Sequence, residues 1–319
     1  MTFKTARILI LIPCLVSLLG CDNEPSPLKV DLTEIATEAE LKHTKPGDLY
    51  RFGFDLRSSP QEDSRQYQSL LTYLHKKTGL QFSLAFVRTD LPVYEQLAAG
   101  SIDFAAAGGV TIVKSMFNGS GVPIAQGVAR TGKTTYQAAI IVSPDSPIKS
   151  LHDLKGKKMA FGNENSTQGH LLPRIILENS GIDLTQLGGY SYTGSHQRCA
   201  DSVIAKAADA CGLQDIMAED LARQGKVRIV ALSDEFPSSG IVAANRIPPS
   251  VREQIQQALL EFRPLGEDAD ALYHWEKTEM ANGFSNVTPE TYRPIEASMR
   301  KLVLSQFNNV GLSRTISLL

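Results

Sequence analysis

Asn163-Glu164-Asn165-Ser166-Thr167-Gln168-Gly169-His170 is a polar, hydroxyl-bearing turn between two apolar segments. Residues 157–162 before it read as a short strand ending in glycine, and residues 171–178 after it carry apolar side chains at helical spacing. This order places unpaired backbone N–H groups and hydroxyls at the positive end of a helix dipole, where phosphate-like anions bind. A simpler interpretation is that Ser166 or Thr167 only caps the helix, since both are usual N-cap residues. The rest of the chain decides between the two.

Strand patterns and helix patterns alternate over most of the sequence. Helices are expected at residues 64–77, 93–99, 111–117, 171–178, 197–207, 215–223, 249–262 and 289–304. Strands are expected at residues 49–56, 82–87, 102–107, 124–128, 136–142, 157–162, near 190, and at 210–213, 227–232 and 241–244. Such alternation predicts an α/β fold with largely parallel sheets.

The N-terminus has the pattern of an export signal. Lys4 and Arg7 give a positive start, and residues 8–19 form an apolar core too short to span a membrane. Residues 1–21 close on Leu18-Leu19-Gly20-Cys21, which resembles the lipobox of bacterial lipoproteins, so Cys21 is expected to carry lipid. The alternative is an ordinary cleaved signal with an incidental cysteine. Residues 22–47 are polar and are expected to form a flexible tether.

Composition limits the remaining possibilities. About 270 residues remain after the tether, enough for one large domain or two smaller ones, and the net charge of −2 gives no indication of a nucleic-acid partner. No second long apolar run is present. No Cys-x-x-Cys or His-x-x-x-His spacing marks a metal site, so neither a metal nor a cofactor is expected.

Gly127-Val128-Ala129-Arg130-Thr131-Gly132-Lys133-Thr134 fits the nucleotide-binding P-loop pattern letter for letter. That chemistry needs a loop that opens into a helix, whose N–H groups hold the phosphates. Residues 135–142 are instead rich in strand-forming types, and exported proteins meet little ATP. We therefore reject an ATPase and expect a loop between two strands.

Several stretches, in the same order along the chain, resemble the phosphonate, phosphite and phosphate substrate-binding proteins of ABC transporters. They are Ser101-Ile102-Asp103-Phe104-Ala105, Tyr136 with the apolar strand after it, Ser150-Leu151-His152-Asp153-Leu154-Lys155-Gly156-Lys157, Asn165-Ser166-Thr167-Gln168-Gly169 with Pro173, and Gly194-Ser195-His196 followed by Asp209. The most specific is residues 165–169, which resembles the family's phosphonate-holding turn. The resemblance runs from about residue 50 to the C-terminus.

This resemblance implies a type II periplasmic binding protein fold, with two α/β lobes joined by two crossing segments and a ligand cleft between them. Residues 48–137 and 236–319 would form lobe one, and residues 138–235 would form lobe two. Closure of the lobes around ligand would be the working motion.

The family's ligand contacts fall on Tyr136, Ser166, Thr167, Gln168, Gly169 and His196. Hydroxyls and backbone N–H groups of the turn would bind phosphoryl oxygens, and Gly169 would allow close approach of the backbone. His196 would donate a ring N–H, with its charge helping if the anion raises its pKa. Asn165 and Asp209 are secondary candidates, and Asp209 is expected to brace the site or a strand end.

Two positions depart from the family. The place of a first-lobe tyrosine falls on Asp90, with Tyr94 one helical turn later. The place of an aspartate that pairs with amine-bearing phosphonates falls on Ser239. Without that carboxylate an ammonium group lacks its natural partner, so we expect an amine-free ligand: phosphate, phosphite or a small alkylphosphonate.

Cys199 and Cys211 are both expected near the cleft-side edge of lobe two. A disulfide is possible if their Cα atoms come within about 7 Å. Two buried free thiols are the slightly favoured alternative, since Cys is often fully buried.

The family resemblance implies a lipid-anchored, monomeric solute receptor at the periplasmic face of the inner membrane, or another cell-surface anchor, that hands an oxyanion to an ABC permease. The same fold could instead present its closed form to a membrane sensor kinase. No nucleophile–base pair is evident, so we do not expect an enzyme. An exported phosphoesterase is a weak third possibility, because such enzymes usually rely on metal clusters.

Overall fold

The computed structural model describes residues 49–85, 88 and 90–309, and these described residues belong to one compact unit. The expected signal, lipobox and tether therefore lie outside the described residues. None of the helices that the structure describes is long and apolar enough to cross a membrane.

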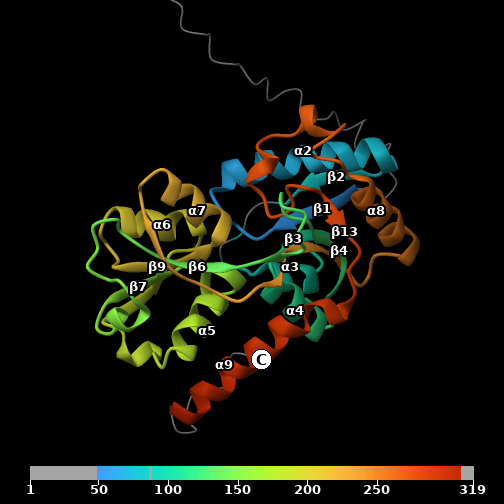
Figure 1. The fold of residues 1–319 in the computed structure, drawn as a ribbon. Coiled ribbons are helices and arrows are strands. Elements are labelled where there is room, and N and C mark those ends of the chain that lie inside the picture. The colour runs from blue at the N-terminus through green and yellow to red at the C-terminus, as the bar shows by residue number, and fades with distance from the viewer. Residues whose placement is uncertain (1–48, 86–87, 89, 310–319) are drawn as a thin grey trace, which may run out of the picture. The chain divides into compact units, whose positions relative to one another are not determined.

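The first sheet has six strands in the order β13-β4-β12-β3-β1-β2. Their bounds are β1 Leu49–Phe54, β2 Gln81–Leu84, β3 Phe104–Ala107, β4 Gly121–Gly127, β12 Gly240–Ala244 and β13 Phe284–Ser285. β1 pairs in parallel with β2 and β3, whereas β12 and β13 pair antiparallel with their neighbours. The helices on the side of the first sheet are α2 Pro60–Thr78, α3 Val93–Ala98, α4 Gly109–Phe117, α8 Pro249–Glu261 and α9 Arg293–Asn309 (Figure 1).

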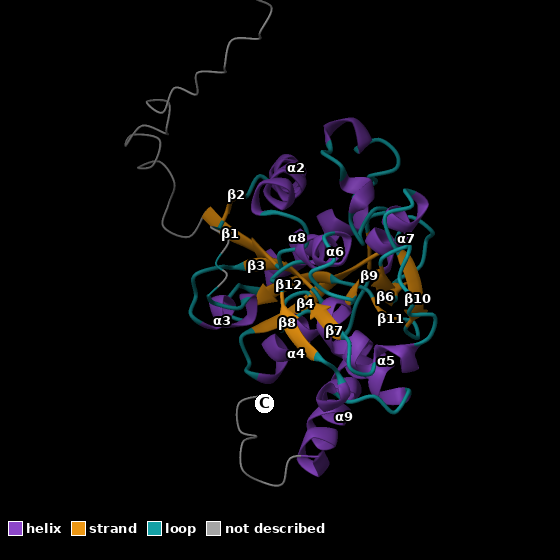
Figure 2. Cartoon of the chain, turned by 90° about the vertical axis from the view of Figure 1, so that its left-hand side faces the viewer, coloured by secondary structure: helices purple, strands orange, loops and turns teal. Residues whose placement is uncertain are grey.

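The second sheet has five strands in the order β10-β6-β9-β7-β8. Their bounds are β6 Ala138–Val142, β7 Lys158–Phe161, β8 Gly189–Tyr192, β9 Ala210–Gln214 and β10 Arg228–Leu232. The helices α5 Leu172–Asn179, α6 His196–Ile204 and α7 Asp215–Arg223 lie beside these strands (Figure 2). All residues of β6 and β9 are buried, as expected for strands covered on both faces.

The expectation of largely parallel sheets is wrong. β6 runs antiparallel to both β9 and β10, and β12 runs antiparallel to both β3 and β4. These two strands directly follow the segments in which the chain passes from one sheet to the other, so each inserts beside strands of the opposite direction. A run of apolar residues shows that a strand is buried but not its direction.

The two passages between the sheets lie side by side. The short strands β5 Thr135–Tyr136 and β11 Phe236–Pro237 pair antiparallel, with Tyr136 opposite Phe236. The Gln137 side chain donates to the carbonyl oxygen of Ser233 at 2.5 Å, which adds a second link between them. The expected single strand over residues 136–142 is thus two strands, interrupted at Gln137.

Helix boundaries follow ordinary capping chemistry. Ser59 accepts the N–H of Glu62 at the start of α2, and Gly79 ends the helix at a φ of 74°, where a side chain would be strained.

The residues between β4 and β5 form a loop, and a strand follows. The rejection of a P-loop is therefore confirmed, since no helix follows to hold phosphates.

Cys199 and Cys211 form a disulfide, with Cα atoms 5.8 Å apart. The preference for two free thiols is therefore wrong. Cys199 lies in the first turn of α6 and Cys211 in β9, and both are fully buried where this helix packs on the strand. The bond fastens the start of α6 to the second sheet.

Candidate ligand-binding site

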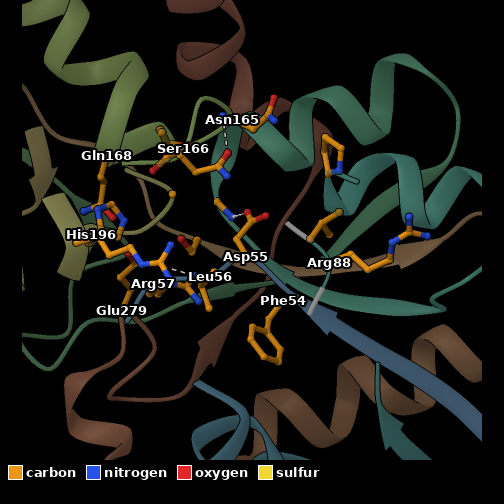
Figure 3. A pocket seen from close by; sticks show the side chains of 18 of the residues that line it. Phe54, Asp55, Leu56, Arg57, Arg88, Asn165, Ser166, Gln168, His196 and Glu279 are labelled. Atoms are coloured by element: carbon orange, nitrogen blue, oxygen red, sulfur yellow. Dashed lines mark hydrogen bonds and ion pairs between the residues drawn. The ribbon is translucent and has the colours of Figure 1, made fainter. Parts of the chain in front are cut away.

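A cavity of about 230 Å³ opens where the ends of strands from both sheets meet. Its lining comes from the end of β1, the segment before α3, the start of α4, the passage at Tyr136, the turn before α5 and the start of α6 (Figure 3). The lining residues are Phe54, Asp55, Leu56, Arg57, Arg88, Leu91, Pro92, Val93, Gly108, Tyr136, Asn163, Asn165, Ser166, Thr167, Gln168, Gly194, His196, Arg198, Ser239 and Glu279. We call this cavity the cleft.

Residues 163–168 and 194–198 form one side of the cleft, which we call the turn wall. Ser166 caps the helix that follows by accepting the N–H of Gly169 at 2.9 Å, so the capping interpretation also holds. The first turn, Thr167–Leu171, is wound as a π-helix before α5 begins. Such local departures from α-helix are frequent at functional sites.

Thr167 and Gln168 hold the turn wall in place. The hydroxyl oxygen of Thr167 accepts the N–H of Val110 at 2.8 Å, a contact with the start of α4. This leaves the hydroxyl hydrogen of Thr167 available as a donor. Gln168 uses its amide group to donate to the Gln137 carbonyl at 2.8 Å and to Asp215 at 3.2 Å. Gln168 therefore connects the turn wall to a passage between the sheets.

Gly169 lies behind the turn wall. A Cβ at this position would lie 2.8 Å from the hydroxyl oxygen of Ser166 and 3.2 Å from the Cα of Gly162. It would also lie 3.1 Å from the ring of His196. Glycine is therefore required for close packing of the turn wall on β7 and α6.

His196 begins α6 and is buried, and its Nδ1 atom has no hydrogen-bond partner. Burial lowers the pKa of His196 to about 4, so the ring is neutral near pH 7. The backbone N–H groups of His196 and Gln197 donate across the cleft to the carbonyl of Arg57, at 3.1 and 3.3 Å. The expected help from a histidine charge is absent in this state, whereas a neutral ring can still donate one N–H.

Tyr136 is the second buried group whose polar atom is unsatisfied. Its hydroxyl approaches Thr167 and the N–H of Gly109, and it makes no regular hydrogen bond. Burial raises the pKa of Tyr136, with Glu279 acting in the same direction, so the phenol keeps its proton. Both unpartnered atoms belong to residues that line the same cleft. Unpaired buried polar atoms are costly, and a ligand would remove this cost.

Asp55, Arg57 and Glu279 form the opposite side, which we call the charged wall; the sequence interpretation missed all three. Arg57 Nη2 lies 3.1 Å from Glu279 Oε2, and Arg57 Nη1 donates to the hydroxyl of Tyr67. Burial opposes the charge of Arg57, but Glu279 and Tyr67 hold its pKa above the ordinary value. Asp55 accepts the N–H of Gly108 at 2.9 Å, and burial raises its pKa.

The other predicted residues divide into two groups. Asn165 and Ser239 line the cleft, and Asn165 accepts a hydrogen bond from Lys114 at 2.9 Å. Asp90 is exposed and pairs with Arg88 at 2.6 Å, so the lining residue of this pair is Arg88. Asp209 accepts the N–H of Lys158 at 2.8 Å, which confirms that it braces a strand end, at the start of β7.

The cleft combines hydrogen-bond donors with charges of both signs. Its donors are hydroxyls, a phenol, an imidazole and the cations Arg57, Arg88 and Arg198, whereas Asp55 and Glu279 supply carboxylates. No group of three or more His, Cys, Asp or Glu side chains is placed to hold a metal ion in the part of the chain that the structure describes.

Known proteins are similar to this chain in sequence and in fold. Residues 52–292 match the family described as ABC transporter, phosphonate, periplasmic substrate-binding protein. The phosphonates-binding periplasmic protein of Escherichia coli K12 is 24% identical over 231 residues, which cover 69% of this chain and 68% of the relative. The phosphate-import protein PhnD of Mycolicibacterium smegmatis is 26% identical over 222 residues, 63% of this chain and 69% of the relative.

Solved structures show the same two-lobed fold. The binding protein of a Pseudomonas aeruginosa ABC phosphonate transporter has a TM-score of 0.72 at 20% identity, covering 83% of this chain and 90% of its own. PhnD1 of Prochlorococcus marinus, in complex with methylphosphonate, has a TM-score of 0.70 at 20% identity, covering 80% and 98%. With the family match spanning most of its length, the chain belongs to the periplasmic substrate-binding proteins of ABC phosphonate transporters.

Proposed function

We propose that the cleft binds a small phosphorus oxyanion (phosphate, phosphite or a small alkylphosphonate) and delivers it to an ABC importer. One observation carries the proposal: Tyr136 Oη and His196 Nδ1 are buried without partners in the cleft that Ser166 and Thr167 line. Uncharged donors at helix starts suit an oxyanion, because they stabilise negative charge without a counter-ion.

The cleft contains carboxylates as well as cations, so a bound anion would not be surrounded by positive groups alone. Arg57 offsets Glu279 directly, and Arg88 and Arg198 line the cleft as further cations. Asp55 can accept but not donate when ionised. It therefore favours a ligand oxygen that carries a proton, as phosphate and phosphonates do near neutral pH.

We further propose that the ligand has no amine. Ser239 lines the cleft and is buried, so an uncharged hydroxyl stands where an ammonium partner would be needed. The charged wall supplies carboxylates, but Glu279 is engaged by Arg57, and Asp55 is the group proposed above to accept the proton-bearing oxygen of the ligand. A preference for aminoethylphosphonate over methylphosphonate would contradict this part of the proposal.

The proposal includes the boundaries and the anchor inferred from sequence. Residues 48–137 with 236–319 would move as lobe one against residues 138–235 as lobe two, with Tyr136 and Phe236 at the hinge. Cys21 would carry lipid and hold the receptor at the periplasmic face of the inner membrane, where it meets the permease. The receptor would act as a monomer and would not transform its ligand.

The test is thermal unfolding of residues 23–319 with phosphate, phosphite, methylphosphonate, aminoethylphosphonate and sulfate. A ligand at a hundred times its dissociation constant stabilises the folded state by about 2.7 kcal/mol, which gives a clear shift in Tm. We expect a shift with at least one amine-free phosphorus oxyanion and none with sulfate. No shift with any phosphorus compound would contradict the proposed function.

Tyr136→Phe is the sharpest variant for this test, because it removes only the unpartnered hydroxyl. A hydrogen bond to a charged group contributes about 1.5–3 kcal/mol, so affinity should fall about ten- to a hundredfold. Tyr190→Phe is the matched control, since its ring is half exposed on β8 and is not part of the cleft lining. Equal affinities for the two variants would exclude Tyr136 as a contact.

A further inference from the structure

A second cavity, also of about 230 Å³, lies on the side of the turn wall away from the cleft, against α9. Figures 1 and 2 both show α9 beside α4 and α5, the helices that form its walls. Its lining residues are Val110, Lys114, Glu164, His170, Leu171, Arg174, Leu184, Tyr190, Tyr192, Met299, Leu302 and Val303. Nothing in the proposed function uses this cavity.

Apolar side chains supply most of its wall. Leu302 and Val303 follow Met299 by three and four residues, so all three lie on one face of α9. Leu171 and Val110 face the same cavity from the first turns of the helices on the other side. A ligand in this space would place an apolar body against α9.

The polar groups at its edge are mostly satisfied among themselves. His170 Nδ1 lies 2.7 Å from the Glu164 carbonyl and therefore carries the hydrogen. Its Nε2 then accepts from the hydroxyl of Tyr192 at 3.0 Å. Burial lowers the pKa of His170 to about 4, in keeping with a neutral ring. Together with the half-exposed Tyr190, these rings form a fixed aromatic edge.

Lys114 is the exception, because no described carboxylate lies within ion-pair distance of its Nζ; Glu164 and Glu95 act on its charge only at longer range. Its Nζ donates to the Asn165 side chain at 2.9 Å and lies 5.0 Å from the centre of the Tyr94 ring. No salt bridge to Lys114 occurs within residues 49–85, 88 and 90–309. By contrast, the second cation, Arg174, pairs with Glu178 at 3.3 Å. An ammonium group has three donors, so Lys114 retains capacity for an anion.

We propose that this cavity is a second binding site, which takes a small amphipathic anion. The anionic group would bind beside Lys114, and the apolar body would pack against Met299, Leu302 and Val303. The cavity lies below the size usual for drug-sized ligands, about 300–1,000 Å³, so it fits a small molecule. The site is separate from the cleft, since the turn places Asn165 in one wall and Glu164 in the other.

Isothermal titration with hexanoate tests the proposal, with hexanol and hexylamine as neutral and cationic probes of the same apolar body. We expect saturable one-to-one binding of hexanoate and binding at least about tenfold weaker for the other two. Lys114→Met should weaken hexanoate by about tenfold, whereas Lys301→Met, an exposed lysine on α9, should not. No binding, or equal binding of hexanol, would overturn the proposal.

Blocking variants locate the site. Val303→Trp and Met299→Trp should each fill the cavity and abolish hexanoate binding, whereas Leu304→Trp, from an exposed neighbour on α9, should preserve it. Each variant is first checked for a cooperative unfolding transition. His196→Ala alters the cleft alone and should retain hexanoate binding. Loss of binding in His196→Ala, or its retention in both blocking variants, would place hexanoate elsewhere and overturn the proposal.

Discussion

The turn wall and the charged wall face the same cleft with different chemistry. The turn wall presents hydroxyls and a neutral imidazole at helix starts, and its groups are contributed by short, contiguous stretches of sequence. The charged wall presents Asp55, Arg57 and Glu279, the last two of which are separated by 222 residues in the chain. In the proposed function the first wall meets the anion, whereas the second holds charges of both signs close together. Each wall therefore makes a different demand on stability and on binding.

The largest effect is expected from breaking the pair on the charged wall. Arg57→Met leaves Glu279 buried without its partner, which should lower the free energy of unfolding by about 3–5 kcal/mol. Urea unfolding at pH 7 measures the loss. Arg57→Met combined with Glu279→Gln removes both charges and should recover most of it. If the double variant is as unstable as the single one, the pair is not the cause.

The turn wall should affect how folding stability depends on pH, through His196. The pKa of His196 is lowered from 6.5 to about 4, so the unfolded chain takes up the proton first as the pH falls. The stability that comes from a neutral His196 is present above pH 6.5 and is lost towards pH 4, by roughly 3 kcal/mol. His196→Gln should lose less stability over this range, as followed by Tm between pH 7 and pH 4.5. If Tm falls equally with pH in the wild type and in His196→Gln, protonation of His196 is not the cause of the loss.

The disulfide sharpens the comparison, because it fastens only the turn wall. Cys199 and Cys211 are separated by 12 residues, and opening a loop of this size costs roughly 2–3 kcal/mol. Cys199→Ser with Cys211→Ser should lower the free energy of unfolding by this amount. Reductant should then change the Tm of the wild type but not of the double variant. If reductant leaves the Tm of the wild type unchanged, even when it is added to the unfolded protein, the disulfide is not present.

The smallest effect is expected at Asp209, which lies outside both walls. Asp209→Asn keeps an acceptor for the N–H of Lys158, so stability should change by no more than about 0.5 kcal/mol. Affinity for the ligand should be unchanged in the same titrations. A marked loss of affinity would return Asp209 to the site and break the division into two walls.

The difference between the walls also explains what could be predicted from sequence. The turn wall depends on local chemistry, in which a strand, a polar turn and a helix follow one another, so residues 163–170 could be recognised directly. Asp55 and Arg57 gave a weaker signal, as charged residues directly after a buried strand, where ligand sites of α/β sheets lie. Glu279 comes from a segment without regular periodicity, and only the tertiary fold brings it to Arg57.

Strand direction and the disulfide were missed for related reasons. Apolar runs identified β6 and β12 as buried, but their antiparallel pairing depends on how the chain passes between sheets. The spacing of Cys199 and Cys211 allowed a bond or free thiols, and only the packing of α6 on β9 distinguishes them. Both errors concern the relation between elements and not the elements themselves.

A crystal structure of the protein grown with methylphosphonate, phosphite or phosphate would show directly which groups hold the oxyanion. We predict phosphorus oxygens within hydrogen-bond distance of the hydroxyls of Ser166 and Thr167, and of Tyr136 Oη and His196 Nδ1. Arg57 should remain paired with Glu279. An oxyanion held instead by Arg88 and Arg198, with Tyr136 and His196 still unpartnered, would rule out the turn wall as the anion-binding side of the cleft.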